Sequence, residues 1–181
     1  MTCRIVPVDL NVCIVLLCTT DLICASLIIG NKEKQEAYNG KALVRKLAID
    51  DLFWKDDIGA WYDMSLDESK AKTDFYPSNI FPLFANCTNL DFRQPSMAQK
   101  VLNYVKKCGV CDYPGGIPTS LMNSGEQWDF PNAWSPLVYL FLESVAKLPF
   151  PEAQHLVNTA ISKWIASNMS ALRDHGHMFE K

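Results

Sequence analysis

A strongly apolar stretch of the chain runs from Val12 to Gly30 and is interrupted by Thr19, Thr20 and Asp21. Asp9 and Asn11, near its start, are residue types that cap helix N-termini, and the Gly30-Asn31 pair is a helix stop. From Lys32 to about Trp54, charged residues alternate with apolar ones near helical spacing. The pattern therefore predicts two helices joined by a short turn, an αα-hairpin.

Two other interpretations of the apolar stretch stay open. A membrane span needs about 20 apolar residues, and Asp21 in its middle would cost a few kcal/mol there. A signal peptide has a basic start and a small-residue cleavage site, whereas here one arginine is followed by Pro7 and Asp9 before the apolar stretch. The residues favour a buried helix. A membrane anchor is the minority alternative, and no clear signal peptide is predicted.

Beyond the hairpin the pattern changes to strand and back to helix. Residues 55–79 carry aromatic segments on either side of Asp67-Glu68-Ser69-Lys70, which is typical of a small β-hairpin excursion. A turn at 76–79 then leads into the short apolar segment Ile80–Phe84. Helices are expected at Ser96–Lys107, Leu137–Lys147 and Pro151–Met169, with a long Gly/Pro-rich loop over Cys108–Pro136. The predicted fold class is all-α, built of helical hairpins with loops gathered toward one end.

Composition and charge exclude some classes of function. The 181 residues, 49% of them apolar and 20% charged, suffice for one folded domain with a sizeable core. The net charge is −3, and lysine and arginine are scattered along the chain. A slightly acidic chain without a basic patch has no electrostatic footprint for nucleic acid. We therefore expect no nucleic-acid partner.

The cysteines suggest neither a disulfide framework nor a metal site. There are seven, an odd number, and four lie in the apolar N-terminal region. Cys108 and Cys111 have the spacing of a zinc knuckle or a redox pair. A zinc site needs a second ligand pair, which the three histidines do not offer at the usual spacing. We expect no metal; a loop disulfide or two free thiols is the simpler interpretation.

Two triplets fit the acceptor pattern for N-glycosylation. They are Asn86-Cys87-Thr88 and Asn168-Met169-Ser170. The pattern matters only in a secreted chain, and two such triplets also arise by chance in a chain of this length.

The most informative residues lie in the irregular loop. Pro114-Gly115-Gly116-Ile117-Pro118-Thr119-Ser120 is followed by a run from Gln127 to Pro136 that contains Trp128, Asp129 and Trp134. Two tryptophans and a carboxylate on a stiff loop can stack on sugar rings and accept hydrogen bonds from hydroxyls. Equally, the tryptophans can simply pack the loop onto the helices, because aromatic side chains contribute strongly to cores. The residues alone leave both interpretations open.

A family resemblance favours the first interpretation. The run Gln127-Trp128-Asp129-Phe130-Pro131-Asn132-Ala133-Trp134-Ser135-Pro136 resembles the second signature of the trehalases, Q-W-D-x-P-x-(G/A/V)-W-x-P. Three shorter segments resemble the same family in the same order, and Met178-Phe179-Glu180-Lys181 resembles its F-E-K-Y motif. The three are Ile5-Val6-Pro7-Val8-Asp9-Leu10-Asn11, Phe75-Tyr76-Pro77-Ser78-Asn79 and Gly115-Gly116-Ile117-Pro118-Thr119-Ser120. The resemblance covers residues 4–181 and is to the animal branch, insects included.

The resemblance implies a fold and a reaction. The fold would be part of an (α/α)6 toroid, and residues 1–181 would be the C-terminal portion of a trehalase catalytic domain. The reaction would be hydrolysis of α,α-trehalose to two glucose molecules with inversion, without a metal or other cofactor. The resemblance makes Glu180 the general base, and Gln127, Trp128, Asp129 and Trp134 substrate-binding residues. It also implies a secreted or extracellular protein.

The resemblance further implies that the site is incomplete in these 181 residues. The family's general acid lies in an E-S-G-W-D motif that this sequence does not contain. We do not expect Asp129 to replace it, because nothing in the sequence raises its pKa. Since each partner of an acid–base pair contributes about 10²–10⁴-fold, we expect the 181-residue chain alone to be inactive. We also expect the apolar run from Val12 to Ile29 to be partly uncovered.

Three hypotheses follow. The chain is part of a working trehalase, or it is a catalytically inactive remnant that binds a sugar or a protein partner, or its apolar run anchors it to a membrane. The first is favoured. The sequence does not predict the oligomeric state.

Overall fold

The computed structural model describes residues 4–179 and is built mainly from helices. Five of them have at least twelve residues, and short helical turns and two-residue strands lie between them. The long helices are α1 (Val8–Ile23), α2 (Lys32–Phe53), α4 (Pro95–Cys108), α5 (Ser135–Ala146) and α6 (Pro151–His175). The short helical segments are η1 (Cys24–Ile29), η2 (Pro77–Ile80) and α3 (Phe81–Phe84). The strands are β1 (Ile5–Val6), β2 (Trp54–Lys55), β3 (Ala60–Trp61), β4 (Met64–Ser65) and β5 (Lys70–Ala71).

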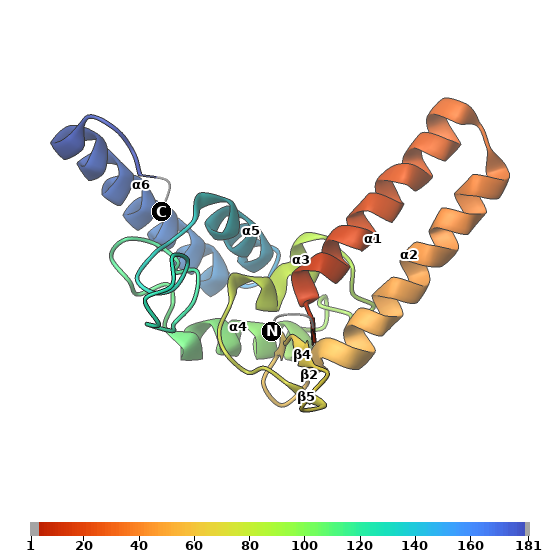
Figure 1. Cartoon of the computed structure of the whole chain (residues 1–181), viewed down its shortest axis with the longest axis horizontal. Coiled ribbons are helices and arrows are strands. Elements are labelled where there is room, and N and C mark those ends of the chain that lie inside the picture. Colours follow the sequence, from red (N-terminus) through yellow and green to blue (C-terminus); the bar gives the residue numbers. More distant parts are fainter. Residues whose placement is uncertain (1–3, 180–181) are drawn as a thin grey trace.

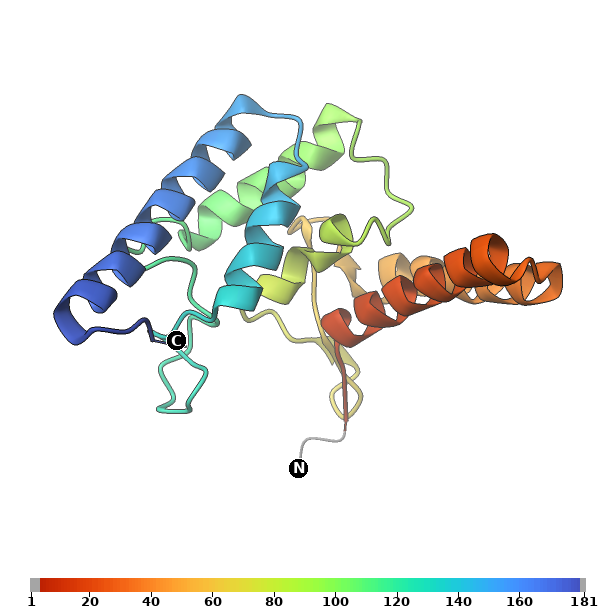
Figure 2. The same ribbon diagram turned by 90° about the horizontal axis from the view of Figure 1, so that it is seen from above.

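The molecule has two helical arms. The α1–α2 hairpin forms one arm, and α5 with α6 forms the other; α3 and the strands lie between them, and α4 lies below α5 in this view (Figure 1). Seen from above, the far half of the α1–α2 hairpin extends away from the other elements (Figure 2). The predicted αα-hairpin and the helices after it are thus confirmed. Helix α6 is longer than predicted and continues past Met169 to His175, where Gly176 ends it with a positive φ of 75°.

The β-hairpin excursion is also confirmed, in a smaller form than the sequence indicated. β4 and β5 pair antiparallel around the polar turn at 66–69, and β1 adds to the other side of β4. A second pair joins β2 and β3, with Trp54 opposite Trp61. The aromatic segment 73–76 forms no strand.

The core lies in the centre of the molecule. Its largest fully buried side chains include Trp61, Phe53 and Phe141, contributed by β3, α2 and α5. Phe75 and Phe141 meet edge to face at 5.9 Å between ring centroids. This core holds the two arms together and fixes the bases of both.

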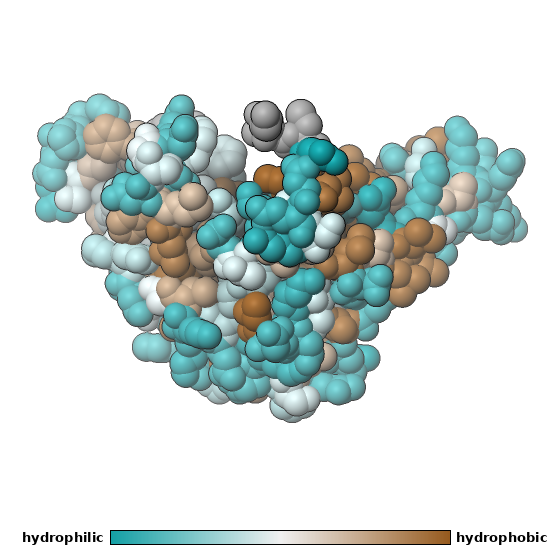
Figure 3. Space-filling model, turned by 60° about the horizontal axis from the view of Figure 1, so that its bottom comes forward, coloured by the Kyte–Doolittle hydropathy of each residue, from teal (hydrophilic) through white to brown (hydrophobic). Residues whose placement is uncertain are grey.

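The far part of the α1–α2 hairpin keeps apolar side chains in solvent. Leu17, Ile28 and Ile29 are 64%, 78% and 66% exposed. The space-filling view shows hydrophobic residues gathered along this arm (Figure 3). The expectation that the apolar run would be partly uncovered is confirmed.

Within residues 4–179, no helix is long and apolar enough to cross a lipid bilayer.

The start of α1 differs from the prediction. The helix begins at Val8, so Asp9 and Asn11 lie inside it and neither is the N-cap. Pro7 occupies that position and has no side chain able to cap. Instead, the backbone N–H of Val8 donates to Oδ1 of Asp63, 55 residues away, at 2.8 Å. A prediction from neighbouring residues could not find this cap, because its donor and acceptor meet only in the folded chain.

We expect Asp63→Ala to destabilise the fold by about 1–2 kcal/mol, the usual cost of losing an N-cap. Asp63→Asn keeps the oxygen acceptor and should cost less. Urea unfolding of both variants, with the exposed Asp51→Asn as a control, measures the difference. Equal stability of Asp63→Ala and the unchanged chain would contradict this role.

The same carboxyl gives a pH dependence. Burial raises the pKa of Asp63 above its ordinary value of 3.8, so the folded state disfavours the charged form. The folded state therefore binds the Asp63 proton more tightly than the unfolded state does. The stabilisation that this proton gives the folded chain is fully present below pH 3.8 and is lost as the pH rises through the folded-state pKa. Asparagine carries no charge to bury, so the cost of Asp63→Asn relative to the unchanged chain should be smaller at neutral pH than below pH 3.8.

Candidate active site

The loop between α4 and α5 carries the signature run. Helix α4 ends at Gly109, whose φ of 64° is left-handed. From there the chain runs to Ser135 without regular secondary structure. Two backbone hydrogen bonds join the two sides of the loop. Thr119 N donates to Asn132 O at 2.9 Å, and Phe130 N donates to Met122 O at 2.8 Å. These bonds hold the segment between them in place, with the side chains of Gln127 and Trp128 exposed to solvent.

Asp129 is held by two serine hydroxyls. Ser120 Oγ donates to one carboxylate oxygen at 2.7 Å, and Ser124 Oγ donates to the other. These hydrogen bonds, first that of Ser124 and then that of Ser120, lower the pKa of the Asp129 carboxyl below its usual range. The group is therefore ionised at neutral pH. It can accept hydrogen bonds from sugar hydroxyls and is a poor candidate for a general acid.

The two tryptophans of the run lie against each other. The ring centroids of Trp128 and Trp134 are 5.3 Å apart, with the planes tilted by 54°. Trp134 is half-buried, and its carbonyl accepts the first amides of α5, from Leu137 and Val138, both at 3.0 Å. Trp128 remains 39% exposed. The pair thus has a fixed base on α5 and an aromatic surface open to a ligand.

Gln127 contributes an exposed side chain to the same loop. Its backbone carbonyl accepts from Asn132 Nδ2 at 2.9 Å, so its backbone is fixed while its side chain is exposed. Four of the predicted site residues, Gln127, Trp128, Asp129 and Trp134, lie in this short segment, where the rings of Trp128 and Trp134 contact each other.

The chain after α6 returns to this loop. Phe179 lines a hollow of about 200 Å³ together with Pro131, Asn132 and Trp164. A neighbouring hollow joins Phe179 and Met178 to Ser135, the residue after Trp134. Figure 2 shows this last segment running back beside the loop. Glu180, the predicted general base, lies outside the described residues.

The loop also packs closely against α6. Gly116 has a φ of +121°, and a Cβ at this position would lie 2.5 Å from Cε3 of Trp164. Lys163 Nζ donates to the carbonyls of Cys111 and Asp112, at 2.9 and 3.1 Å. Helix α6 thereby fixes both the position of the loop and the direction of the chain that follows it.

The sequence analysis did not assign the partners of Asp129. Ser120 belongs to the Gly-Gly-Ile-Pro-Thr-Ser segment, which was noted only for its family resemblance, and Ser124 was not singled out. The available signal was two serines shortly before Asp129 in a Gly/Pro-rich loop, because serine hydroxyls often form hydrogen bonds within turns.

Cys108 and Cys111 are free thiols, as are the other described cysteines. Burial raises the pKa of the Cys108 thiol and raises that of Cys111 to about 11. Thiols held in this form are weak nucleophiles and weak metal ligands. Among residues 4–179, no three His, Cys, Asp or Glu side chains gather in a way that could hold a metal ion.

Comparison with known proteins agrees with the motifs. A family model described as trehalase matches residues 1–181. The trehalase of the rabbit, Oryctolagus cuniculus, is 37% identical over 182 residues, 99% of this chain and 30% of that protein. The trehalase of the honeybee, Apis mellifera, is 38% identical over 177 residues, 98% of this chain and 28% of that protein. The chain therefore spans less than a third of the length of these curated relatives.

Solved structures show the same fold. The neutral trehalase of Saccharomyces cerevisiae matches with a TM-score of 0.74 at 15% identity, covering 97% of this chain and 33% of that one. A mannosylglycerate hydrolase of Thermus thermophilus matches with a TM-score of 0.64, also at 15% identity, covering 97% and 40%. The helical hairpins described above are thus part of an (α/α)6 toroid. By its motifs, its similarity to curated relatives and its fold, this chain belongs to the trehalase family.

Proposed function

We propose that this chain supplies one side of the sugar site of a glycosidase that hydrolyses α,α-trehalose to two glucose molecules with inversion. The observation that carries the proposal is the Trp128–Asp129–Trp134 group, in which two aromatic rings lie against each other and an ionised carboxylate is on the residue next to one of them. Aromatic faces suit the apolar faces of glucose, and the carboxylate suits its hydroxyls. Membership in the trehalase family supports trehalose as the substrate.

The loop residues would bind and orient the sugar. The two serine hydroxyls occupy one hydrogen-bonding direction on each oxygen of Asp129. Each oxygen of a carboxylate has two lone pairs, so further acceptor sites stay available for hydroxyls of the substrate. Trp128 would stack on a glucose ring, and the Gln127 amide would reach a hydroxyl at its edge.

Glu180 would be the general base. In an inverting glycosidase, one carboxylic acid protonates the leaving oxygen while a second carboxylate activates water on the opposite face of the sugar. The two carboxyl groups lie about 6.5–9.5 Å apart, which leaves room for that water. The return of Met178 and Phe179 to the signature loop supports a role for the next residue, Glu180, at that site. Asp129, with its lowered pKa, does not suit the acid role.

In this proposal the 181 residues alone do not hydrolyse trehalose, because they contain no E-S-G-W-D motif with the family's general acid. A chimaera tests this together with the function of the chain. The matching segment of the honeybee trehalase, which is 38% identical, is replaced by this chain. The chimaera should release glucose from trehalose, whereas the isolated chain should not. Glucose release by the isolated chain would contradict the proposed incompleteness.

Asp129→Asn tests the role of the loop in the same chimaera. A hydrogen bond to a charged group contributes about 1.5–3 kcal/mol, so kcat/KM should fall by about 10–100-fold. Asp112→Asn changes an exposed carboxylate of the same loop and should leave the rate unchanged. Equal effects of the two variants would show that Asp129 does not contact the substrate. A chimaera that releases no glucose would favour the alternative of a catalytically inactive trehalase-like remnant.

We also propose that the protein is secreted or extracellular, as the family resemblance implies.

A further inference from the structure

The two N-glycosylation triplets lie in very different surroundings. Asn86-Cys87-Thr88 follows the short helix α3 in an irregular segment, whereas Asn168-Met169-Ser170 lies inside the long helix α6. Asn86 borders neither of the hollows beside the signature loop, whereas Asn168 lines both. Their geometry allows a choice between them that the sequence pattern alone does not.

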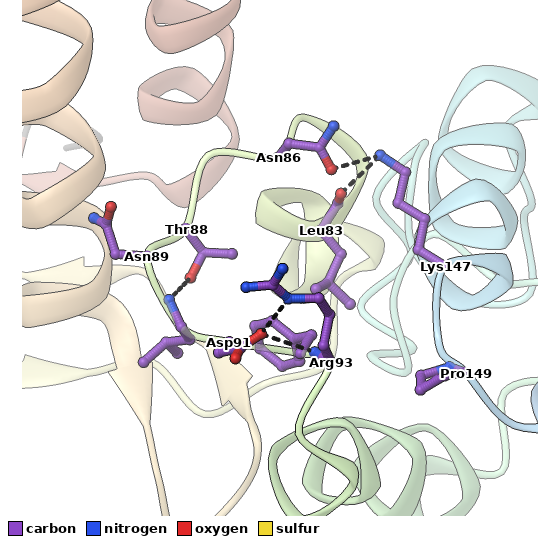
Figure 4. Close-up of a pocket in the computed structure, with 10 residues that line it drawn as sticks. Leu83, Asn86, Thr88, Asn89, Asp91, Arg93, Lys147 and Pro149 are labelled. Carbon is purple, nitrogen blue, oxygen red and sulfur yellow. Dashed lines mark hydrogen bonds and ion pairs between the residues drawn. The ribbon is translucent and has the colours of Figure 1, made fainter.

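The side chain of Asn86 presents its amide nitrogen to solvent. Asn86 is exposed, and its φ of +50° places it at a turn. Lys147 Nζ donates to its Oδ1 at 3.1 Å, and also to the carbonyls of Leu83 and Phe84 at 3.0 and 2.6 Å. An ammonium group has no acceptor, so the amide oxygen must face the lysine and the nitrogen must face away. Figure 4 shows this orientation.

The space beside Asn86 is open. A surface hollow of about 450 Å³ borders this residue. Leu83, Leu90 and Pro149 contribute apolar surface to it. A sugar attached at Asn86 could therefore lie against the protein without displacing a helix or a core side chain.

Asn168 has the opposite arrangement. It is half-buried in α6, and its Nδ2 donates to the Trp164 carbonyl one turn earlier at 2.9 Å. The residue also lines the hollow that Pro131 and Phe179 share. A glycan on this nitrogen would enter the narrow space between α6 and the signature loop.

We propose that Asn86 is an N-glycan acceptor and that Asn168 is not. In the reaction, the Asn86 amide nitrogen would lose one proton and form a bond to the anomeric carbon of an oligosaccharide carried on a lipid pyrophosphate. The bond from that carbon to the lipid pyrophosphate breaks, and the lipid pyrophosphate leaves. Thr88 completes the acceptor triplet, and its hydroxyl donates to Asp50 Oδ1 at 2.7 Å in the folded chain.

The test is site occupancy in the full chain, expressed in insect or mammalian cells behind a cleavable secretory leader. Peptide N-glycosidase treatment in heavy-oxygen water converts each glycosylated asparagine to labelled aspartate, which peptide mass spectrometry locates. The cell-retained and the secreted fractions are both measured. Label is expected at residue 86 and not at residue 168. Label at residue 168, or its absence at residue 86, would overturn the proposal.

Variants separate the acceptor from its neighbours. Asn86→Gln should abolish the glycan-dependent mass shift of the intact chain, and Asn168→Gln should leave it unchanged. Because Asn86 also binds Lys147, a second pair keeps that contact: Thr88→Ala should abolish the shift, and Thr88→Ser should retain it. A shift that persists in Thr88→Ala would contradict the assignment.

Discussion

Glu180→Gln in the honeybee chimaera is expected to lower kcat by about 10²–10⁴-fold, the range for losing a general base. Glutamine is nearly isosteric with glutamate but cannot take a proton from water. KM should change little, because the loop residues that bind the sugar remain. Initial rates of glucose release over a range of trehalose concentrations separate the two parameters.

Glu152→Gln is a suitable control for this variant. Glu152 lies in the first turn of α6, where it pairs with Lys106 at 2.7 Å with both side chains about half exposed. Exposed ion pairs of this kind contribute about 0–1 kcal/mol, so the control should retain full activity. A Glu180→Gln chimaera with unchanged kcat would remove Glu180 from the mechanism.

Gly116→Ala is expected to destabilise the 181-residue chain by about 2–5 kcal/mol. Two costs combine: a side chain at a φ of +121° is strained, and a Cβ 2.5 Å from the Trp164 ring must displace that ring or the loop. Thermal and urea unfolding would both show the loss. The Trp128–Trp134 pair should be perturbed as well, because Gly116 fixes the position of the loop on α6.

Gly40→Ala provides a control with the same chemical change. Gly40 lies inside α2, and no heavy atom lies within 4 Å of a Cβ placed there. Alanine is favoured over glycine within helices by about 1 kcal/mol, so this variant should be more stable than the unchanged chain. Similar stability of the two alanine variants would contradict the close packing of Gly116 against Trp164 of α6.

Much of the helical structure could be predicted from local patterns. The Val12–Gly30 run with its Gly-Asn stop predicted α1 and the turn, and Pro151 marked the start of α6. Such elements are set by residues three or four apart along the chain, so a single sequence contains the information. The end of α6 was missed because four of the six residues between Met169 and Gly176 are polar or charged, which weakens the apolar pattern there.

Contacts between distant segments could not be predicted in this way. The cap of α1 by Asp63 joins residues 55 positions apart, and the packing of Gly116 on Trp164 depends on where α6 lies. The signature loop was found because its motif is specific to a family, whereas the serines that hold Asp129 were recognised only in three dimensions. The role of Glu180 stays a prediction.

The central claim is that the signature loop and Glu180 line one sugar pocket. A crystal structure of the chimaera with a non-hydrolysable trehalose analogue tests it most directly. We predict that Trp128 and Asp129 contact the bound sugar, and that the Glu180 carboxylate lies within hydrogen-bond reach of a water facing its anomeric carbon. A structure with Glu180 on a separate surface, away from the bound analogue, would contradict the account.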